Sequence, residues 1–252
     1  MAAQASTQTA TGADRVTVIP GPVLLLGAPG VGKGTQAQIL MDRWGIPQVS
    51  TGDLIRDNIR EGTAVGREFQ DLVARGIFVP DALVNRMVEG RLAKQDAARG
   101  YILDGYPRTL GQAEWLDAQL DGPGFPGEHG EITPAGRLPV IAVSIEVRYD
   151  ELLRRITGRR TGPVSKRIYN IYTNPPLSPG VCDVDGEPLV QRPDDTEQVF
   201  SERMKQFAEL TAPVIEHYRG LGRFEVVDGE RSVEDVTTDI VAALGRLRRG
   251  AL

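Results

Sequence analysis

Cysteine, histidine and lysine are scarce in this chain of 252 residues. The single cysteine, Cys182, excludes an intramolecular disulfide and a cysteine-rich zinc site, and it is typical of a reducing compartment. The two histidines, His129 and His217, are expected to be structural or solvated. Only four of the 29 basic residues are lysines, so the chain relies on arginine, whose planar guanidinium suits phosphate and carboxylate. High genomic GC content would produce the same bias.

Long apolar runs and a positive net charge are also missing. No run approaches the ~20 residues that span a bilayer, so we expect no membrane partner. The net charge of −5 argues against a nucleic-acid binder, which needs a basic surface. Residues 1–22 lack the apolar core of a signal peptide, and their one arginine is too few for a transit peptide. They predict a disordered tail before one folded domain, residues 23–252. We expect a cytoplasmic protein, with an organellar location through this extension left open.

Short apolar runs alternate with amphipathic helical patterns along the chain. The runs at 23–26, 46–49, 101–103, 140–145 and 224–227 predict buried parallel strands. Apolar residues at 3- and 4-residue spacing predict helices at 35–44, 53–60, 64–75, 80–94, 110–120, 149–157, 195–219 and 233–247. This alternation predicts an α/β fold, in which helices cover both faces of a five-stranded parallel sheet.

Two stretches interrupt the alternation. Residues 121–139 are dense in glycine and proline and predict a surface loop, to which we assign no function. Residues 158–192 contain alternating segments such as RIYNIY among glycine, proline and aspartate, and they predict a small, mostly β insertion. No heptad pattern or apolar stripe demands a dimer, so we expect a monomer.

Residues 27–33, GAPGVGK, follow a predicted strand and open a predicted helix, which is the context of a phosphate-binding loop. Its glycines let successive N–H groups face phosphate oxygens, and Lys33 adds a full positive charge. The usual motif has Ser or Thr after the lysine, but here Gly34 follows and Thr35 comes one step later. Either Thr35 serves the phosphates and the metal, or carboxylates such as Asp104 hold Mg²⁺ through water. The loop predicts a P-loop NTPase-type fold.

Six motifs in this order resemble the adenylate kinase family: GAPGVGKGTQ (27–36), STGDLIR (50–56), IFVPD (77–81), DGYPRT (104–109), RITGRR (155–160) and QRPDD (191–195). The resemblance covers roughly residues 22–245 and is to the long-lid form, in which GKGT replaces GK[ST]. It implies reversible transfer of the γ-phosphoryl group from MgATP to AMP, giving two ADP. It also implies an NMP-binding segment at about 50–79 and a lid at about 158–192. No general base is expected, because the acceptor phosphate is already anionic and catalysis consists of positioning and charge stabilisation.

The resemblance implies a role for each matching residue. ATP is expected at Gly30, Val31, Gly32, Lys33, Gly34, Thr35, Arg155, Arg159, Ile168, Tyr169 and Arg231. AMP is expected at Thr51, Arg56, Ile77, Phe78, Val79, Gly105, Tyr106, Pro107, Arg108, Gln112, Arg192 and Arg203. The catalytic set is Lys33, Arg108, Arg159, Arg192 and Arg203, and Mg²⁺ is expected through water near Asp104 and Asp53. The amide of Gln112 can both donate and accept, so it can match the adenine edge.

Some of these residues also have simpler explanations. Thr51 stands at a predicted helix start and could serve only as its N-cap, and the same holds for Asp194 and Asp195. In the family this Asp pair also contributes to lid closure. Arg108 could make an ordinary surface salt bridge.

The sequence departs from the family pattern in the lid. Many bacterial members hold the lid with four zinc ligands, whereas here only Cys182 and acids such as Asp185 remain, with Gly162 and Ser165 opposite. We therefore expect no structural zinc and a lid held by hydrogen bonds and packing. Asn170 replaces a frequent histidine, a change seen in relatives that prefer GTP. A GTP:AMP phosphotransferase, a UMP/CMP kinase and an inactive nucleotide-binding regulatory protein remain alternatives.

Overall fold

The computed structural model describes residues 21–74, 79–122, 124–125 and 138–251. Ile77, Phe78 and His129, nearly all of the predicted tail and most of the predicted loop at 121–139 lie outside these residues. The first strand begins at Pro22, one residue inside the predicted tail. Within the described ranges, no helix is both long and apolar enough to span a bilayer.

Five parallel strands form the central sheet, as predicted. They are β1 (Pro22–Leu26), β2 (Gln48–Ser50), β3 (Tyr101–Asp104), β4 (Ile141–Glu146) and β7 (Phe224–Asp228). Their order across the sheet is β2-β3-β1-β4-β7, and every neighbouring pair is parallel. Strand β1, which leads into the phosphate loop, therefore lies in the middle with a partner on each side.

The side chains of β1 alternate between two hydrophobic cores, one on each face of the sheet. Leu24 and Leu26 pack in the core that α4 (Asp81–Leu92), α5 (Leu110–Asp121) and α8 (Ala212–Gly220) cover. Val23 and Leu25 pack in the other core, under α1 (Lys33–Trp44) and α9 (Val233–Gly250). All four side chains are buried, which explains why a continuous apolar run predicted this strand.

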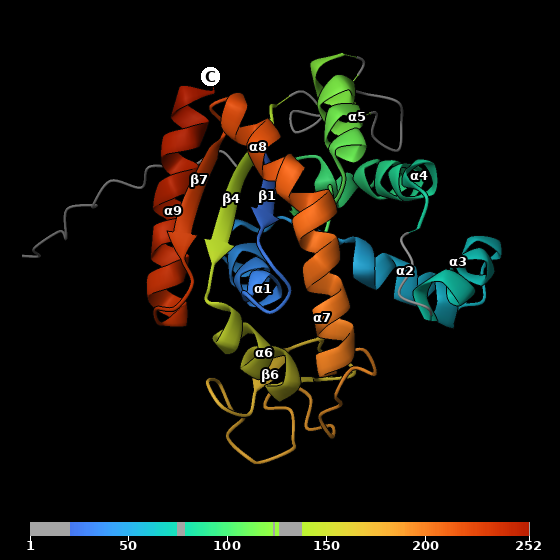
Figure 1. Ribbon diagram of the computed structural model, residues 1–252, viewed down its shortest axis with the longest axis vertical. Coiled ribbons are helices and arrows are strands. Elements are labelled where there is room, and N and C mark those ends of the chain that lie inside the picture. Colours follow the sequence, from blue (N-terminus) through green and yellow to red (C-terminus); the bar gives the residue numbers. More distant parts are fainter. Residues whose placement is uncertain (1–20, 75–78, 123, 126–137, 252) are drawn as a thin grey trace, which may run out of the picture.

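Two parts of the chain project from this core (Figure 1). Helices α2 (Thr51–Arg60) and α3 (Ala64–Ala74) extend to one side. Between α6 (Tyr149–Gly158) and α7 (Glu197–Gln206), the strands β5 (Arg159–Thr161) and β6 (Ile168–Asn170) form an antiparallel pair. Isolated bridges, such as the one between Thr161 and Val190, extend this pairing across the insertion. We call residues 158–192 the lid.

The helix predicted at 195–219 is three consecutive segments. Helix α7 begins after Thr196, whose hydroxyl accepts a hydrogen bond from the Val199 N–H. A π-helical turn at Phe207–Thr211 then separates α7 from α8. Pro213 follows this turn and has no N–H to donate to the preceding turn, so a regular α-helix cannot continue through it.

Candidate active site

The carboxyl ends of the central strands open into a cavity of about 520 Å³, between the phosphate loop, the start of α2 and the lid. Ligands of parallel sheets bind at this edge. Most of the predicted site residues line it: Gly30, Val31, Gly32, Lys33, Gly34, Thr35, Asp53, Arg56, Asp104, Gly105, Tyr106, Pro107, Arg108, Arg155, Arg159, Ile168, Tyr169, Arg192, Arg203 and Arg231. Thr51, Val79 and Gln112 are buried and do not line this cavity.

The phosphate loop joins β1 to α1 through a backbone that only glycine adopts readily. Gly27, Gly30 and Gly32 have φ angles of 130°, 91° and 102°. At Gly27 a Cβ would also lie 2.5 Å from a carbonyl oxygen of β4. The loop is therefore fixed by its own backbone and by close contact with the neighbouring strand.

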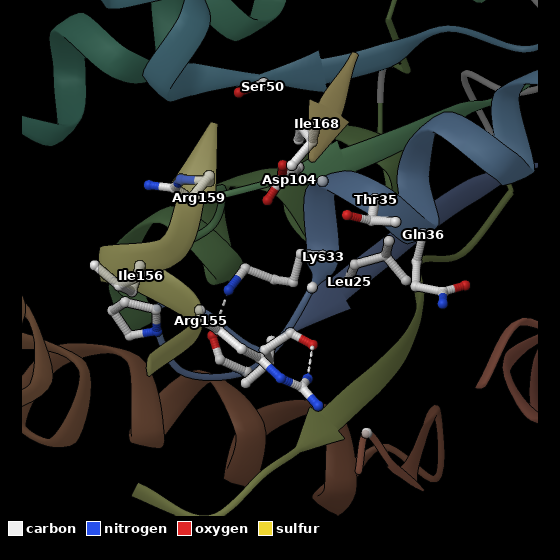
Figure 2. Close-up of a pocket in the computed structure, with 18 of the residues that line it drawn as sticks. Leu25, Lys33, Thr35, Gln36, Ser50, Asp104, Arg155, Ile156, Arg159 and Ile168 are labelled. Carbon is white, nitrogen blue, oxygen red and sulfur yellow. Dashed lines mark hydrogen bonds between the residues drawn. The ribbon is translucent and has the colours of Figure 1, made fainter. Parts of the chain in front are cut away.

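Lys33 is the first residue of α1, and its side chain folds back over the loop. Its Nζ donates hydrogen bonds to the carbonyl oxygens of Gly27, at 2.6 Å, and Ala28, at 3.0 Å. Burial lowers the pKa of Lys33 to about 8, against the opposing effect of Asp104. Figure 2 shows Lys33 and Asp104 in the middle of the cleft, with Ile168 of the lid above them in this view.

Gly34 stands where the usual motif has a hydroxyl residue, and a lid side chain comes close to it. A Cβ at this position would lie 2.9 Å from Cδ1 of Ile168, in β6. A second contact fixes the lid to the same helix, since the Gln38 Nε2 donates to the Lys166 carbonyl oxygen at 2.7 Å. The GKGT sequence therefore leaves room for a lid side chain over the start of α1.

The start of α2 forms the opposite wall of the cleft. Ser50 is the N-cap, because its hydroxyl accepts from the Asp53 N–H at 3.3 Å. The alternative that Thr51 caps this helix is wrong: its hydroxyl donates to the Gly105 carbonyl oxygen at 2.7 Å and ties α2 to the end of β3. Arg56 lies beside the helix start, as predicted, with its Nη2 2.5 Å from Asp53 Oδ1.

Arg108 and Gln112 are joined through the backbone. The Arg108 N–H donates to Gln112 Oε1 at 2.8 Å, and the Arg108 Nε donates to the Gly105 carbonyl oxygen at 2.8 Å. Gln112 is only 2% exposed, so it lies behind the cleft wall that Arg108 forms. Arg108 makes no ion pair with any described residue, against the alternative of an ordinary surface salt bridge.

One arginine of the lid and one of α7 are paired with the two aspartates that we expected as caps. Arg159 forms an ion pair with Asp195, whose side chain is fully buried, and Arg203 forms one with Asp194. Thr196 caps α7, so the capping explanation for the Asp pair is wrong. Burial, and then repulsion from Arg159 and Arg56, lowers the pKa of Arg192, another of the predicted catalytic arginines. The cleft therefore gathers several arginines, two of which are paired with aspartates.

Two glutamines in the cleft escaped the sequence reasoning. Gln38 stands four residues after Gly34, so it lies on the same face of α1, and this spacing is the signal that could have found it. Gln48 precedes the STGDLIR motif, and its Nε2 donates to Asp104 Oδ2 at 2.8 Å. The hydrogen bond between Gln48 and Asp104 joins β2 to β3, and nothing in the local sequence predicts it.

Hydrogen bonds hold the lid together. Cys182 Sγ lies 3.2 Å from Ser165 Oγ and 3.5 Å from the Tyr169 hydroxyl oxygen. The Ser165 N–H donates to Asp185 Oδ2 at 2.7 Å. The part of the chain that the structure describes has no group of three or more His, Cys, Asp or Glu arranged to hold a metal ion.

The fold, the glycine-rich loop and the arginine-lined cleft define a nucleotide-binding protein of the P-loop class. A family model described as adenylate kinase matches residues 25–223. Curated relatives named adenylate kinase include that of Gloeobacter violaceus, which is 45% identical over 88% of this chain and 98% of its own length. The adenylate kinase of Fusobacterium nucleatum is 40% identical over 88% of this chain and 98% of its own length. That of Bacillus subtilis is 38% identical over 90% of this chain and 99% of its own length. The chain belongs to the adenylate kinase family, which confirms the resemblance.

Proposed function

We propose that the chain transfers the γ-phosphoryl group of ATP reversibly to AMP, giving two ADP. One observation carries this proposal: Lys33 on the phosphate loop and Arg56 and Arg108 on the opposite wall line the same cleft. The loop accounts for a triphosphate, and the opposite wall accounts for a second phosphorylated substrate. The relatives' name, adenylate kinase, supports AMP as that substrate.

On the donor side, we propose that the N–H groups of residues 30–35 and the Lys33 ammonium bind the β- and γ-phosphates. The position of Arg155 supports this assignment of the donor side. Its Nε donates a hydrogen bond to Glu151 Oε1 at 3.0 Å, which fixes the side chain. Its Nη1 also lies 3.5 Å from the Val31 carbonyl oxygen, which places the guanidinium against the loop. Arg155 and the backbone of Arg231 would contact the donor base, with Ile168 and Tyr169 of the lid on the donor nucleotide.

On the acceptor side, we propose that Arg56 and Arg108 bind the AMP phosphate and that Gln112 reads the adenine edge. Thr51 would act chiefly by holding the wall, since its hydroxyl is bonded to Gly105. Arg159, Arg192 and Arg203 would neutralise charge on the moving phosphoryl group. No residue has to remove a proton, because the attacking oxygen belongs to an anionic phosphate.

The cleft fits a magnesium ion. Asp104 and Thr35 bring a carboxylate and a hydroxyl to it, and such hard oxygen ligands suit Mg²⁺, directly or through water. The hydrogen bond from Gln48 orients the Asp104 carboxylate. Asp53 fits less well, because its carboxylate is bound to Arg56. When bound, Mg²⁺ would neutralise charge on the β- and γ-phosphates.

We also propose that the lid, residues 158–192, and the NMP-binding segment, residues 50–79, close over the substrates. Closure would exclude water, which competes with AMP as an acceptor. Hydrogen exchange with a bisubstrate analogue should show added protection in both segments, and unchanged exchange in the lid would contradict the proposal. We further propose a cytoplasmic monomer; the single, buried cysteine supports a reducing compartment, and sedimentation velocity tests the monomer.

The decisive experiment is a matrix of initial rates with magnesium, in which ATP and GTP are crossed with AMP, UMP, CMP and GMP. We expect ATP with AMP to dominate. Asn170 gives no support to GTP, because its Nδ2 donates to the Arg155 carbonyl oxygen and its Oδ1 accepts from the Tyr172 N–H. A dominant rate with GTP or a pyrimidine acceptor would overturn the specificity, and no rate at all would favour a regulatory binding protein.

A further inference from the structure

Asp81, the first residue of α4, contacts the residue that we propose to read the acceptor base. Its Oδ1 accepts a hydrogen bond from Gln112 Nε2 at 2.7 Å. Its Oδ2 accepts one from the Thr109 hydroxyl, also at 2.7 Å. Thr109 is the N-cap of α5 and accepts from the Gln112 N–H at 3.2 Å, so one short network fixes both the backbone and the side chain of Gln112.

This network leaves the Gln112 amide only one favourable orientation. A carboxylate can only accept hydrogen bonds, and the Arg108 N–H on the other side can only donate. A half-turn of the amide would bring Oε1 against the Asp81 carboxylate and Nε2 against the Arg108 N–H. Because Gln112 is 2% exposed, water could not replace the two lost hydrogen bonds.

The fixed amide keeps one N–H and one oxygen lone pair in a defined order. Adenine presents an acceptor, the ring nitrogen N1, beside a donor, its 6-amino group. A 6-oxopurine such as hypoxanthine presents the reverse, a donor at N1 beside an acceptor at O6. One orientation of the amide therefore matches adenine and opposes hypoxanthine, and the other does the opposite.

We propose that Asp81 is a positioning residue that sets the preference of the acceptor site for AMP over 6-oxopurine nucleotides. It does so by holding the Gln112 amide in one orientation. This inference rests on the proposed function and adds to it the origin of base discrimination. A purely structural role is the alternative, since an acidic residue in the first turn stabilises a helix. That role would affect stability and leave the preference between the two bases unchanged.

The test compares kcat/KM for AMP and for IMP with ATP as donor. IMP is the chosen probe because it differs from AMP only at the edge that Gln112 would read. Asp81→Ala should lower the AMP-to-IMP ratio about tenfold or more, since a site that matches hydrogen bonds discriminates strongly only while its polar groups are fixed. Asp81→Asn keeps an oxygen that can accept from Gln112, so it should retain most of the ratio. Glu234→Ala removes a first-turn acid from α9 as a matched control and should leave the ratio unchanged.

A double-mutant cycle separates positioning from structure. In a Gln112→Ala protein, the further change Asp81→Ala should leave the ratio unchanged, because there is no amide to orient. The inference is overturned if Asp81→Ala keeps the wild-type ratio, or if it lowers the ratio equally without Gln112. A wild-type protein that phosphorylates neither nucleotide would contradict the proposed function instead. In that case the ratio of the AMP and IMP binding affinities, measured by calorimetry in the wild type and in Asp81→Ala, would still test the role of Asp81.

Discussion

Lys33 should take up a proton when the protein binds ATP in mildly alkaline solution. Burial lowers its pKa to about 8, Asp104 raises it, and the nearby Arg108, Arg159 and Arg203 lower it further. A triphosphate beside the ammonium favours the charged form and returns the pKa to at least its ordinary value of ~10.4. The complex then holds more protons than the free protein, so ATP affinity must fall as the pH rises above 8.

The magnitude follows from these two pKa values. With a pKa of about 8 before binding, only about one molecule in ten carries a charged Lys33 at pH 9. Binding at pH 9 should therefore take up ~0.9 proton, and the ATP affinity should be about eightfold lower than at pH 7.5.

Titration calorimetry with MgATP and no acceptor measures both quantities. Two buffers of different ionisation enthalpy at each pH give the number of protons taken up. Lys33→Arg is the matched variant, because a guanidinium stays charged at pH 9 and should remove the uptake. Uptake below ~0.2 proton in the wild type, or equal uptake in Lys33→Arg, would refute the reasoning.

Three further predictions concern the loop and the lid. Gly34→Ser should lower kcat/KM for ATP about fivefold, because the new Cβ would press on Cδ1 of Ile168. Adding Ile168→Val, which removes that methyl group, should restore kcat/KM. Steady-state kinetics that show no rescue in the double variant would contradict this prediction. Asp195→Asn leaves Arg159 without its anionic partner and should lower the free energy of unfolding by about 3 kcal/mol in urea titrations, so a change under ~1 kcal/mol would argue against it. Gly27→Ala combines a strained φ with a backbone contact of 2.5 Å, so it should lower the free energy of unfolding by about 3 kcal/mol. An unchanged melting temperature would count against this account.

The centre of the sheet was predictable because the strands β1, β3 and β4 are buried on both faces. The apolar run at 23–26 matches β1, Pro22–Leu26, to within one residue, and the other four runs also became strands. The long helix at 195–219 was less predictable, because apolar spacing continues through it while Pro213 interrupts its hydrogen bonds. Periodicity reports which face is buried, and it does not report where the backbone pattern changes.

The candidate site was predictable in its residues and less so in their contacts. The resemblance to the adenylate kinase family implied a shared site for the loop, the α2 start and the lid arginines. The structure places them in one cleft, and the roles proposed for them stay predictions. Ser50 and Thr51 are adjacent hydroxyl residues, and only tertiary structure decides which one caps α2. The contact between Asp81 and Gln112 joins residues 31 positions apart, so no local pattern reveals it.

The pairing of Arg159 with Asp195 and of Arg203 with Asp194 means that these guanidinium groups carry their own counterions. A chloride ion gains little from a cation that a carboxylate already neutralises. A polyphosphate can displace that carboxylate, because it bridges several arginines at once and its charge is larger. The aspartates therefore favour the binding of highly charged anions over singly charged ones. Nucleotide binding should depend less steeply on ionic strength than the number of arginines in the cleft suggests.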